Sequence, residues 1–375
     1  MKKGIITFLL LVVVGTALYF GLQARRRNQG ADGEGLVRRA SKMPEVEVVF
    51  KAGGEKMGFL RDPDLLAYLQ RNHHLTLKPE KEGSVEMVRQ PIAGLDALWP
   101  ASEYCRQEFE IRAQREGIHF TSQDVFNSPL VVASWPPVAE SFRQPARGLI
   151  ELREGSYNVL DMEKLTKLID EGTTWKKIGL PLHGRVTFKS TDPTKSNSGA
   201  MFAGLIANIL NGGDPCPLEK VESLMPRIRL IFSLMGLKEV SSGDIFEHFL
   251  AQGMGSYPMI VAYENQYIEA ISAPDAPASL RNEVVIFYPD PTVWSSHPFI
   301  ALTDNGKRLL EAFKDPYVQK LAWEHHGFRS GAIGAMNDPQ IFKTRGIPKQ
   351  VLSAMPSPEY RVMDLITRAL GAPTP

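Results

Sequence analysis

The chain lacks the residue patterns that many enzymes and metalloproteins require. Its only cysteines, Cys105 and Cys216, make no metal-ligand pattern, and their spacing does not decide whether they pair. There is no Gly-x-Ser-x-Gly turn, no phosphate-binding loop that ends in Gly-Lys-Ser/Thr, and no His-Glu-x-x-His motif. These absences favour a binding protein over a catalyst, and no cofactor is expected.

The chain also lacks a large charge excess of either sign. The formal net charge is +1, but residues 1–30 hold five basic and no acidic side chains, which leaves 38 basic against 42 acidic side chains in the remainder. Residues 31–375, called the body below, therefore have a net charge of −4, which does not favour nucleic-acid binding. Asp192 and Glu264 could form a catalytic acid–base pair only if the fold brings them together. Carboxylates scattered along a sequence are normally solvated surface groups, so these two residues do not favour an enzyme.

An uncharged, mostly apolar stretch runs from Gly4 to Leu22 between two lysines and three arginines. Nineteen helical residues at about 1.5 Å each span roughly 28 Å, which is enough to cross a bilayer core. Residues 22–24 are a poor cleavage signal, so residues 1–30 predict an uncleaved single-pass anchor in the cytoplasmic (inner) membrane. We expect the body to face the periplasm or cell exterior; because basic residues flank both sides, a cytoplasmic body stays open as the alternative.

The most informative segment is a hydroxyl- and glycine-rich turn between a strand-like run and an apolar helix. The run covers residues 185–189, the turn residues 190–199 and the helix residues 200–210. The first turn of a helix has backbone N–H groups without partners and a partial positive charge, so this junction suits an anion or a polar oxygen. Helix capping is the simpler explanation, but the three hydroxyls of Thr191, Ser196 and Ser198, together with Asn197 and Gly199, exceed what capping requires.

Elsewhere, short apolar strands alternate with helices. Strands are expected at residues 46–50, 75–77, 96–99, 130–135, 259–263 and 284–288, and helices from Asp62 and at residues 83–88, 139–147, 161–171, 218–236, 243–253, 306–327 and 357–370. This alternation predicts an α/β fold with largely parallel sheets, in which ligands lie beyond the carboxyl ends of strands. About 345 residues follow the anchor, and that length favours two lobes.

Several segments together carry a likeness to a known family. They are residues 53–56, 83–87, 96–100, 191–199, 255–259, 263–264 and 318–329. In these segments the chain resembles extracellular solute-binding proteins of the type 2 periplasmic-binding fold, the group that includes molybdate, phosphate and sulfate receptors. The family's loop after the first strand often has Ser as its second residue, whereas this chain has Gly54, which removes one hydroxyl donor.

The resemblance implies two lobes, each a mostly parallel sheet flanked by helices, with the ligand in the cleft between them. We expect the crossings near residues 129–135 and 259–264. Lobe 1 is then residues 45–130 plus 265–330, and lobe 2 is residues 131–264. Residues 31–44 are expected to be a linker, and residues 331–375 a C-terminal extension with a helix.

Turns of both lobes supply the expected ligand donors. The candidate ligand-binding residues are Gly53, Gly54, Ser102, Thr191, Lys195, Ser196, Asn197, Ser198, Gly199 and Tyr257. Glycine allows a close approach of the backbone, and Lys195 could neutralise an anion. Ser102 equally suits a helix cap, and Tyr257 equally suits core packing, because a buried Tyr commonly finds a hydrogen-bond partner.

No metal site is expected. The pairs His73-His74 and His325-His326 are adjacent in sequence, and adjacent residues do not share a face of a helix. No carboxylate–histidine spacing supports a metal cage.

These observations predict a membrane-anchored solute-binding protein, not an enzyme, that captures a small polar or anionic solute for an ABC-type transporter, with a permease as partner. The alternative is a sensory or scaffold component of an envelope complex that uses the same fold without transport and binds another envelope protein. A hydrolase is the third possibility, and it requires carboxylates or a nucleophile in the cleft. The identity of the solute and the oligomeric state do not follow from the sequence.

Overall fold

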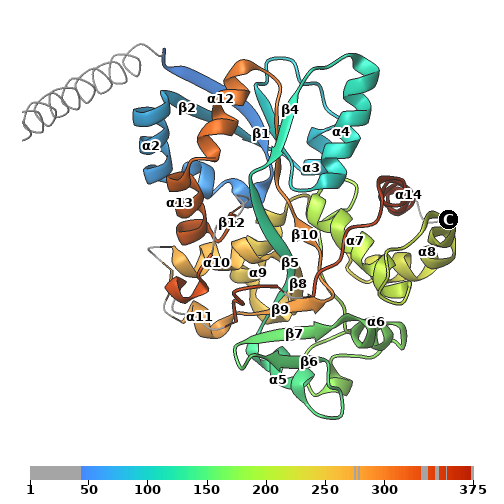
Figure 1. The fold of residues 1–375 in the computed structure, drawn as a ribbon. Helices are drawn as coiled ribbons and strands as arrows, with labels where there is room; N and C mark the ends of the chain where they lie inside the picture. Colours follow the sequence, from blue (N-terminus) through green and yellow to red (C-terminus); the bar gives the residue numbers. More distant parts are fainter. Residues whose placement is uncertain are drawn as a thin grey trace, which may run out of the picture.

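The computed structural model describes residues 44–273, 276–277, 279–330, 337–342, 346–351 and 353–372. The predicted anchor, and all of the linker except Pro44, lie outside the described residues. Within that part of the chain, no helix combines the length and the apolar character needed to cross a bilayer. Two sheets organise the fold, one above the other in Figure 1, and the elements around each are called here the first and the second lobe.

The first lobe is built on a five-stranded sheet with the order β2-β1-β3-β11-β4. Strand β1 pairs in parallel with β2 and β3, whereas β11 is antiparallel to both β3 and β4. The strands are β1 (Val46–Ala52), β2 (Leu75–Lys81), β3 (Ala97–Trp99), β4 (Thr121–Asp124) and β11 (Pro298–Ala301). The helices are η1 (Gly54–Lys56), η2 (Phe59–Arg61), α2 (Pro63–His73), α3 (Ser84–Met87), α4 (Glu103–Glu116), α12 (Asp304–Phe313) and α13 (Pro316–His326).

The second lobe is built on a seven-stranded sheet, in which β10-β5-β9-β7-β6 are neighbours and β8 and β12 also pair with β5. The strands are β5 (Phe126–Ser134), β6 (Ile150–Arg153), β7 (Tyr157–Asp161), β8 (Met259–Tyr263), β9 (Val285–Asp290), β10 (Trp294–Ser295) and β12 (Arg329–Ser330). The helices are α5 (Pro136–Arg143), α6 (Met162–Asp170), η3 (Lys176–Ile178), α7 (Asn197–Leu210), α8 (Leu218–Ser233), α9 (Ser242–Ser256), α10 (Glu264–Ser272), α11 (Leu280–Glu283), η4 (Pro339–Phe342) and α14 (Tyr360–Gly371).

Both sheets are mixed, so the prediction of mostly parallel sheets is wrong. In the second sheet only β7 and β9 pair in parallel, and β5 is antiparallel to β8, β9, β10 and β12. Strands β6 and β7 form a hairpin whose turn holds Glu154 and Gly155 at positive φ. Antiparallel neighbours can be joined by such short turns, and a local pattern of strand and helix does not specify them.

Residues 185–189 do not form the expected strand. Lys189 alone connects to β8, by a single bridge in which its N–H donates to the Met259 carbonyl at 2.8 Å. The helix expected over residues 306–327 is two helices, because Asp315 and Pro316 end α12 and begin α13. The predicted start at Asp62-Pro63 is confirmed, since the Asp62 carboxylate caps α2.

The chain enters the second sheet along β5 and returns along β10, which pairs with β5 at Ser128 and Pro129, before it reaches β11. The expected first lobe includes residues 285–290, but β9 there pairs with β5 and β7 of the second sheet. The second crossing in the structure therefore lies between β9 and β11, later in the chain than residues 259–264.

The two lobes share an apolar cluster. Ala200 of α7 and Met363 of α14 pack with first-lobe residues that include Val85, Tyr104 and Phe109. Figure 1 shows α14 beside α7 and α8, and its Tyr360 ring stacks on Tyr104 of α4 at 5.5 Å. The C-terminal helix therefore contacts both lobes.

Candidate functional site

The N-terminus of α7 lies between the lobes, and its first turn is buried. Ser196 precedes the helix without a side-chain cap, and the backbone N–H groups of Asn197, Ser198 and Gly199 have no acceptor within the described part of the chain. Three uncapped amides at one helix end carry the partial positive charge of the helix dipole. Helix ends of this kind suit an anion or a polar oxygen.

The hydroxyls of the predicted turn gather at the same place. Thr191 Oγ1 and Ser198 Oγ are 2.7 Å apart, and Ser196 Oγ lies 3.3 Å from Ser198 Oγ. Gly199 is required, because a Cβ there would clash with the Thr191 carbonyl. Asp192 shapes the turn by accepting from the N–H and the hydroxyl of Thr194 at 2.8 and 2.7 Å.

Two of the predicted residues join the lobes directly. Ser102 Oγ donates to Asn197 Oδ1 and also accepts from Cys105 N–H at 3.4 Å as the N-cap of α4. The Asn197 amide then donates to Tyr263 Oη at 2.9 Å. Ser102 and Asn197, which the sequence predicts as ligand donors from opposite lobes, are therefore paired with each other in the structure.

The backbone of Lys195 forms a second connection. Its carbonyl accepts from Val85 N–H at 3.2 Å and Glu86 N–H at 3.4 Å, so it closes the first turn of α3. Gly83 permits this approach, since a Cβ there would clash with the same carbonyl. The Lys195 side chain is exposed. It is the backbone of Lys195, not its charge, that takes part in the closed cleft.

Gly53 and Gly54 lead into η1 at the same interface. Neither has positive φ, so the double glycine is not needed for a left-handed turn. Gly54 instead gives room to the Ser241 hydroxyl, which caps α9 of the second lobe. A Cβ on Gly53 would meet the Glu55 carboxylate.

Glu55 and Lys56 form a buried ion pair that was not among the predicted site residues. Burial lowers the pKa of Lys56, and the neighbouring Glu55 carboxylate opposes that effect. Lys56 Nζ also lies 5.5 Å from the centre of the Trp99 ring. Ser242 Oγ of α9 donates to Glu55 Oε2 at 3.2 Å, so the pair also connects the lobes.

Two buried polar atoms near this ion pair have no hydrogen-bond partner among the described residues, and these are His297 Nδ1 and Asn265 Oδ1. His297 Nδ1 lies 3.7 Å from Glu55 Oε1, and burial lowers the pKa of His297 well below 6.5, with the charge of Lys56 adding to the effect. Asn265 donates from Nδ2 to the Glu55 carbonyl at 3.3 Å. Buried polar atoms without partners are uncommon and mark a place where a bound group could supply the missing bonds.

Tyr257 lies away from these contacts. Its hydroxyl donates to Glu239 Oε1 at 3.3 Å, its carbonyl accepts from Trp135 Nε1 at 2.7 Å, and Lys189 Nζ lies 4.7 Å above its ring. These contacts place Tyr257 in the packing behind the 191–199 turn and not beside Ser102 or Asn197.

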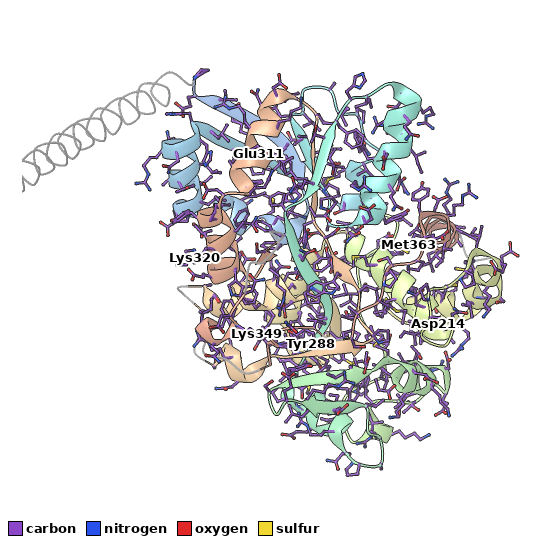
Figure 2. All side chains as sticks on the ribbon, viewed as in Figure 1. Asp214, Tyr288, Glu311, Lys320, Lys349 and Met363 are labelled. Atoms are coloured by element: carbon purple, nitrogen blue, oxygen red, sulfur yellow. The ribbon has the colours of Figure 1, made fainter. Side chains whose placement is uncertain are left out.

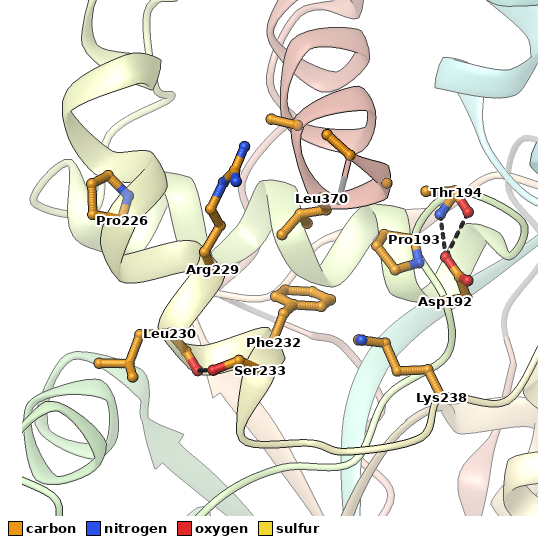
Figure 3. A pocket seen from close by; sticks show the side chains of 13 residues that line it. Asp192, Pro193, Thr194, Pro226, Arg229, Leu230, Phe232, Ser233, Lys238 and Leu370 are labelled. Carbon is orange, nitrogen blue, oxygen red and sulfur yellow. Dashed lines mark hydrogen bonds between the residues drawn. The ribbon is translucent and has the colours of Figure 1, made fainter. Parts of the chain in front are cut away.

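A cavity of about 430 Å³ lies on the outer side of the same turn, between α8 and the end of α14 (Figure 3). Arg229 and Lys238 line it together with Asp192 and the ring of Phe232. None of the hydroxyls predicted as ligand donors lines this cavity. It is therefore separate from the cleft.

Both cysteines are free thiols and both are buried. Cys105 is buried on α4, where burial raises the pKa of its thiol to about 12, and Cys216 is buried before α8. Sequence spacing left their pairing open, and the structure has both as thiols. Their burial gives neither the exposure nor the lowered pKa that a reactive thiol requires.

His325 and His326 do reach a common partner, contrary to the argument from adjacency. Both rings contact Asp62 Oδ2, at 2.8 Å from His325 Nδ1 and 2.9 Å from His326 Nε2. The two rings need not share a face of α13, because the carboxylate comes from a residue about 260 positions earlier in the chain and sits between them. Local spacing gives no signal for such a cluster.

No protein-family model and no curated protein matches this sequence. Solved structures do match its fold. The ferric binding protein from Campylobacter jejuni is 11% identical with a TM-score of 0.54, covering 86% of this chain and 97% of that one. The substrate binding protein of an ABC transporter from Agrobacterium tumefaciens is 13% identical with a TM-score of 0.53, covering 88% and 95%.

A periplasmic thiamin binding protein is 10% identical, with a TM-score of 0.56 and coverage of 87% and 95%. At such identities the likeness shows the fold alone. The chain therefore has the two-lobed α/β fold of extracellular solute-binding proteins, as the sequence resemblance implied.

Proposed function

We propose that this two-lobed chain is an extracytoplasmic solute-binding protein that holds a small polar or anionic solute between its lobes. The observation that carries the proposal is the uncapped, buried N-terminus of α7, with three free amides on a turn whose Asn197 side chain contacts Ser102 of the first lobe. The structures with the same fold include proteins described as binding ferric ion and thiamin, and one described as part of an ABC transporter.

The mechanism that fits this geometry is hinged closure. In the closed form Glu55 neutralises Lys56, and Ser102 pairs with Asn197. Separation of the lobes would break the Ser102–Asn197 and Ser242–Glu55 contacts and free their polar groups. A solute with acceptor oxygens then replaces the protein's own acceptors, taking donors from Ser102, from the 196–198 turn and from Lys56.

A thermal-shift screen of the full chain in detergent, against oxyanions, metal ions, amino acids, sugars and thiamin, tests this function. A ligand at a hundred times its dissociation constant stabilises the native state by about 2.7 kcal/mol. The Asn197→Ala/Ser198→Ala double variant should lose that stabilisation. Ser223→Ala should keep it, because this exposed α8 hydroxyl donates only to its own helix. Unchanged affinity in the double variant would show that the α7 terminus is not the site.

A second function is supported by a different observation. The lobes contact each other through paired polar groups and through the apolar cluster that Ala200 and Met363 complete. A cleft closed in this way suits a sensory or scaffold component of an envelope complex that binds no solute. A screen with no stabilising compound, together with a cross-linked partner other than a permease, would favour this function.

The proposal places the chain on the cytoplasmic membrane through residues 4–22, with the body outside. The apolar length of that segment and the fold shared with binding proteins described as extracellular or periplasmic support this placement. A permease is the expected partner for transport.

A further inference from the structure

The junction of η2, α2, α10 and α13 holds a cluster of metal-ligating side chains that the cleft does not use. We propose that Asp62, His325 and His326 form a divalent transition-metal site, for which Zn²⁺ is the best-suited ion. The three candidate ligand atoms, one from each residue, lie within 4.8 Å of one another. Two imidazoles and one carboxylate are a ligand set that Zn²⁺ takes in proteins.

The carboxylate is oriented before any ion arrives. Asp62 Oδ1 accepts from Asp64 N–H at 2.7 Å and from Leu65 N–H at 3.1 Å, because Asp62 is the N-cap of α2. These bonds hold one oxygen and present the other, Oδ2, to both histidines. The ligand geometry is thus built on a helix terminus and not on a mobile surface chain.

His326 has a carboxylate on the ring nitrogen that faces away from the proposed metal, as metal-bound imidazoles usually do. Its Nδ1 lies 2.9 Å from Glu269 Oε1 of α10, while its Nε2 faces Asp62. A proton on Nδ1 donated to a carboxylate leaves the Nε2 lone pair for the metal and fixes the ring. The edge-to-face contact of His326 with Phe59, at 5.7 Å and 82°, holds the same orientation.

The charges also suit a divalent cation. His326 lies between the carboxylates of Asp62 and Glu269, at 2.9 Å from each. The two positive charges of a divalent ion bound at Nε2 would balance the negative charges of Asp62 and Glu269. The His325 side chain is 43% exposed, which leaves a route to solvent and a position for a water ligand.

The test uses the full chain in detergent, without an affinity tag and after treatment with a chelator. Co²⁺ is titrated while the visible absorption bands of a four- or five-coordinate ion are followed, and Zn²⁺ is then added as competitor. The wild-type chain should bind one Co²⁺, and Zn²⁺ should displace it. No saturable binding to the wild-type chain would overturn the proposal and leave the three residues as ion pairs between helices.

Variants locate the bound ion. His325→Ala removes a half-exposed ligand and should abolish binding, whereas Glu269→Gln should weaken Zn²⁺ affinity by about 10- to 100-fold. His248→Ala is the matched control, because His248 also pairs with a carboxylate, Glu239 at 2.8 Å, in the second lobe. Binding that survives His325→Ala, or is lost in His248→Ala, contradicts the assignment.

A cleft variant separates this site from the solute site. Asn197→Ala/Ser198→Ala should leave Co²⁺ binding unchanged, because the cluster lies between helices of the first lobe and α10, away from the α7 terminus. The proposal of a metal site can therefore be tested independently of solute binding. Loss of Co²⁺ binding in this cleft variant would mean that the ion binds in the cleft and would overturn the proposal.

Discussion

At the scale of single residues, the Glu55–Lys56 ion pair is buried between the lobes, so the loss of one partner should be costly. Lys56→Met leaves the buried Glu55 charge without its lysine counter-charge, which should lower the free energy of unfolding by about 3–5 kcal/mol. The Glu55→Gln/Lys56→Met double variant should lose less than Lys56→Met, because no unpaired charge remains. Urea unfolding of the wild type, the single variants Lys56→Met and Glu55→Gln, and the double variant measures both effects.

The control for this cycle is another pair that joins the lobes. Lys81 and Asp244 form an ion pair with side chains 39% and 33% exposed. Lys81→Met should change the unfolding free energy by less than about 1 kcal/mol, because exposed pairs are screened by solvent. A double variant as unstable as the sum of its single variants would show that Glu55 and Lys56 do not act as a pair.

His297 gives the fold a dependence on pH. It faces Glu55, Lys56, Ser295 and the rings of Tyr263 and Phe328, and burial lowers its pKa well below 6.5. The unfolded chain therefore takes up a proton first, and His297 makes the fold less stable as pH falls below about 6.5. The slope contributed by one group is at most about 1.4 kcal/mol per pH unit.

The measurement is the difference in unfolding free energy between the wild type and His297→Asn at pH 7.5 and 5.5. The wild type should lose more stability than the variant on acidification, because groups common to both proteins cancel. His119→Asn is the control, since His119 is exposed. An equal loss in the wild type and His297→Asn would mean that His297 is not neutral and buried.

At the scale of elements, the contact between α3 and the 191–199 turn gives a direct test of whether the lobes are closed on each other. Gly83→Ala places a methyl group against the Lys195 carbonyl, so the turn must move away from α3. Overpacking of this kind should cost about 1–3 kcal/mol and lower the melting temperature. Gly255→Ala is the control, because a Cβ there meets no atom within 4 Å. Equal melting temperatures for the two variants would refute a close contact at Gly83.

The elements that the sequence predicted well are those with a local physical signal. Asp62-Pro63 begins α2, and apolar runs form β5, β8 and β9. The failures are non-local: among the described residues, 185–189 make only two isolated bridges, Arg185 with Thr174 and Lys189 with Ile260, and the antiparallel order of β5 depends on segments more than a hundred residues away.

The contacts of the candidate site also fall into local ones, which the sequence predicts, and non-local ones, which it does not. The 191–199 turn contains its own hydroxyl contacts, such as Thr191 with Ser198, and these follow from residue type and short spacing. The contacts of Ser102 with Asn197 and of Asp62 with His325 join distant parts of the chain. No periodicity or motif encodes which distant residues meet, so these pairs could not be predicted.

At the scale of the whole molecule, residues 1–30 should decide where the protein resides. The full chain should sediment with membranes and resist carbonate extraction, and a chain without residues 1–30 should stay in the supernatant. The physical reason is the transfer of about nineteen apolar residues into the bilayer core. An equally membrane-bound truncated chain would exclude the anchor, and digestion of the body by external protease in spheroplasts would establish its orientation.

The C-terminal helix α14 contacts both lobes, and these contacts bear on the rate at which a solute could exchange. Tyr360 and Thr367 of α14 contact Tyr104 of the first lobe, whereas Met363, labelled in Figure 2, lies against Gly204 of the second, with its Sδ 2.6 Å from the position of a Cβ. If the lobes open as proposed, α14 cannot accompany both, and one of its faces would have to detach. Solute exchange would then reach a maximum rate that does not depend on solute concentration, and the residence time of the solute would measure how firmly α14 is held.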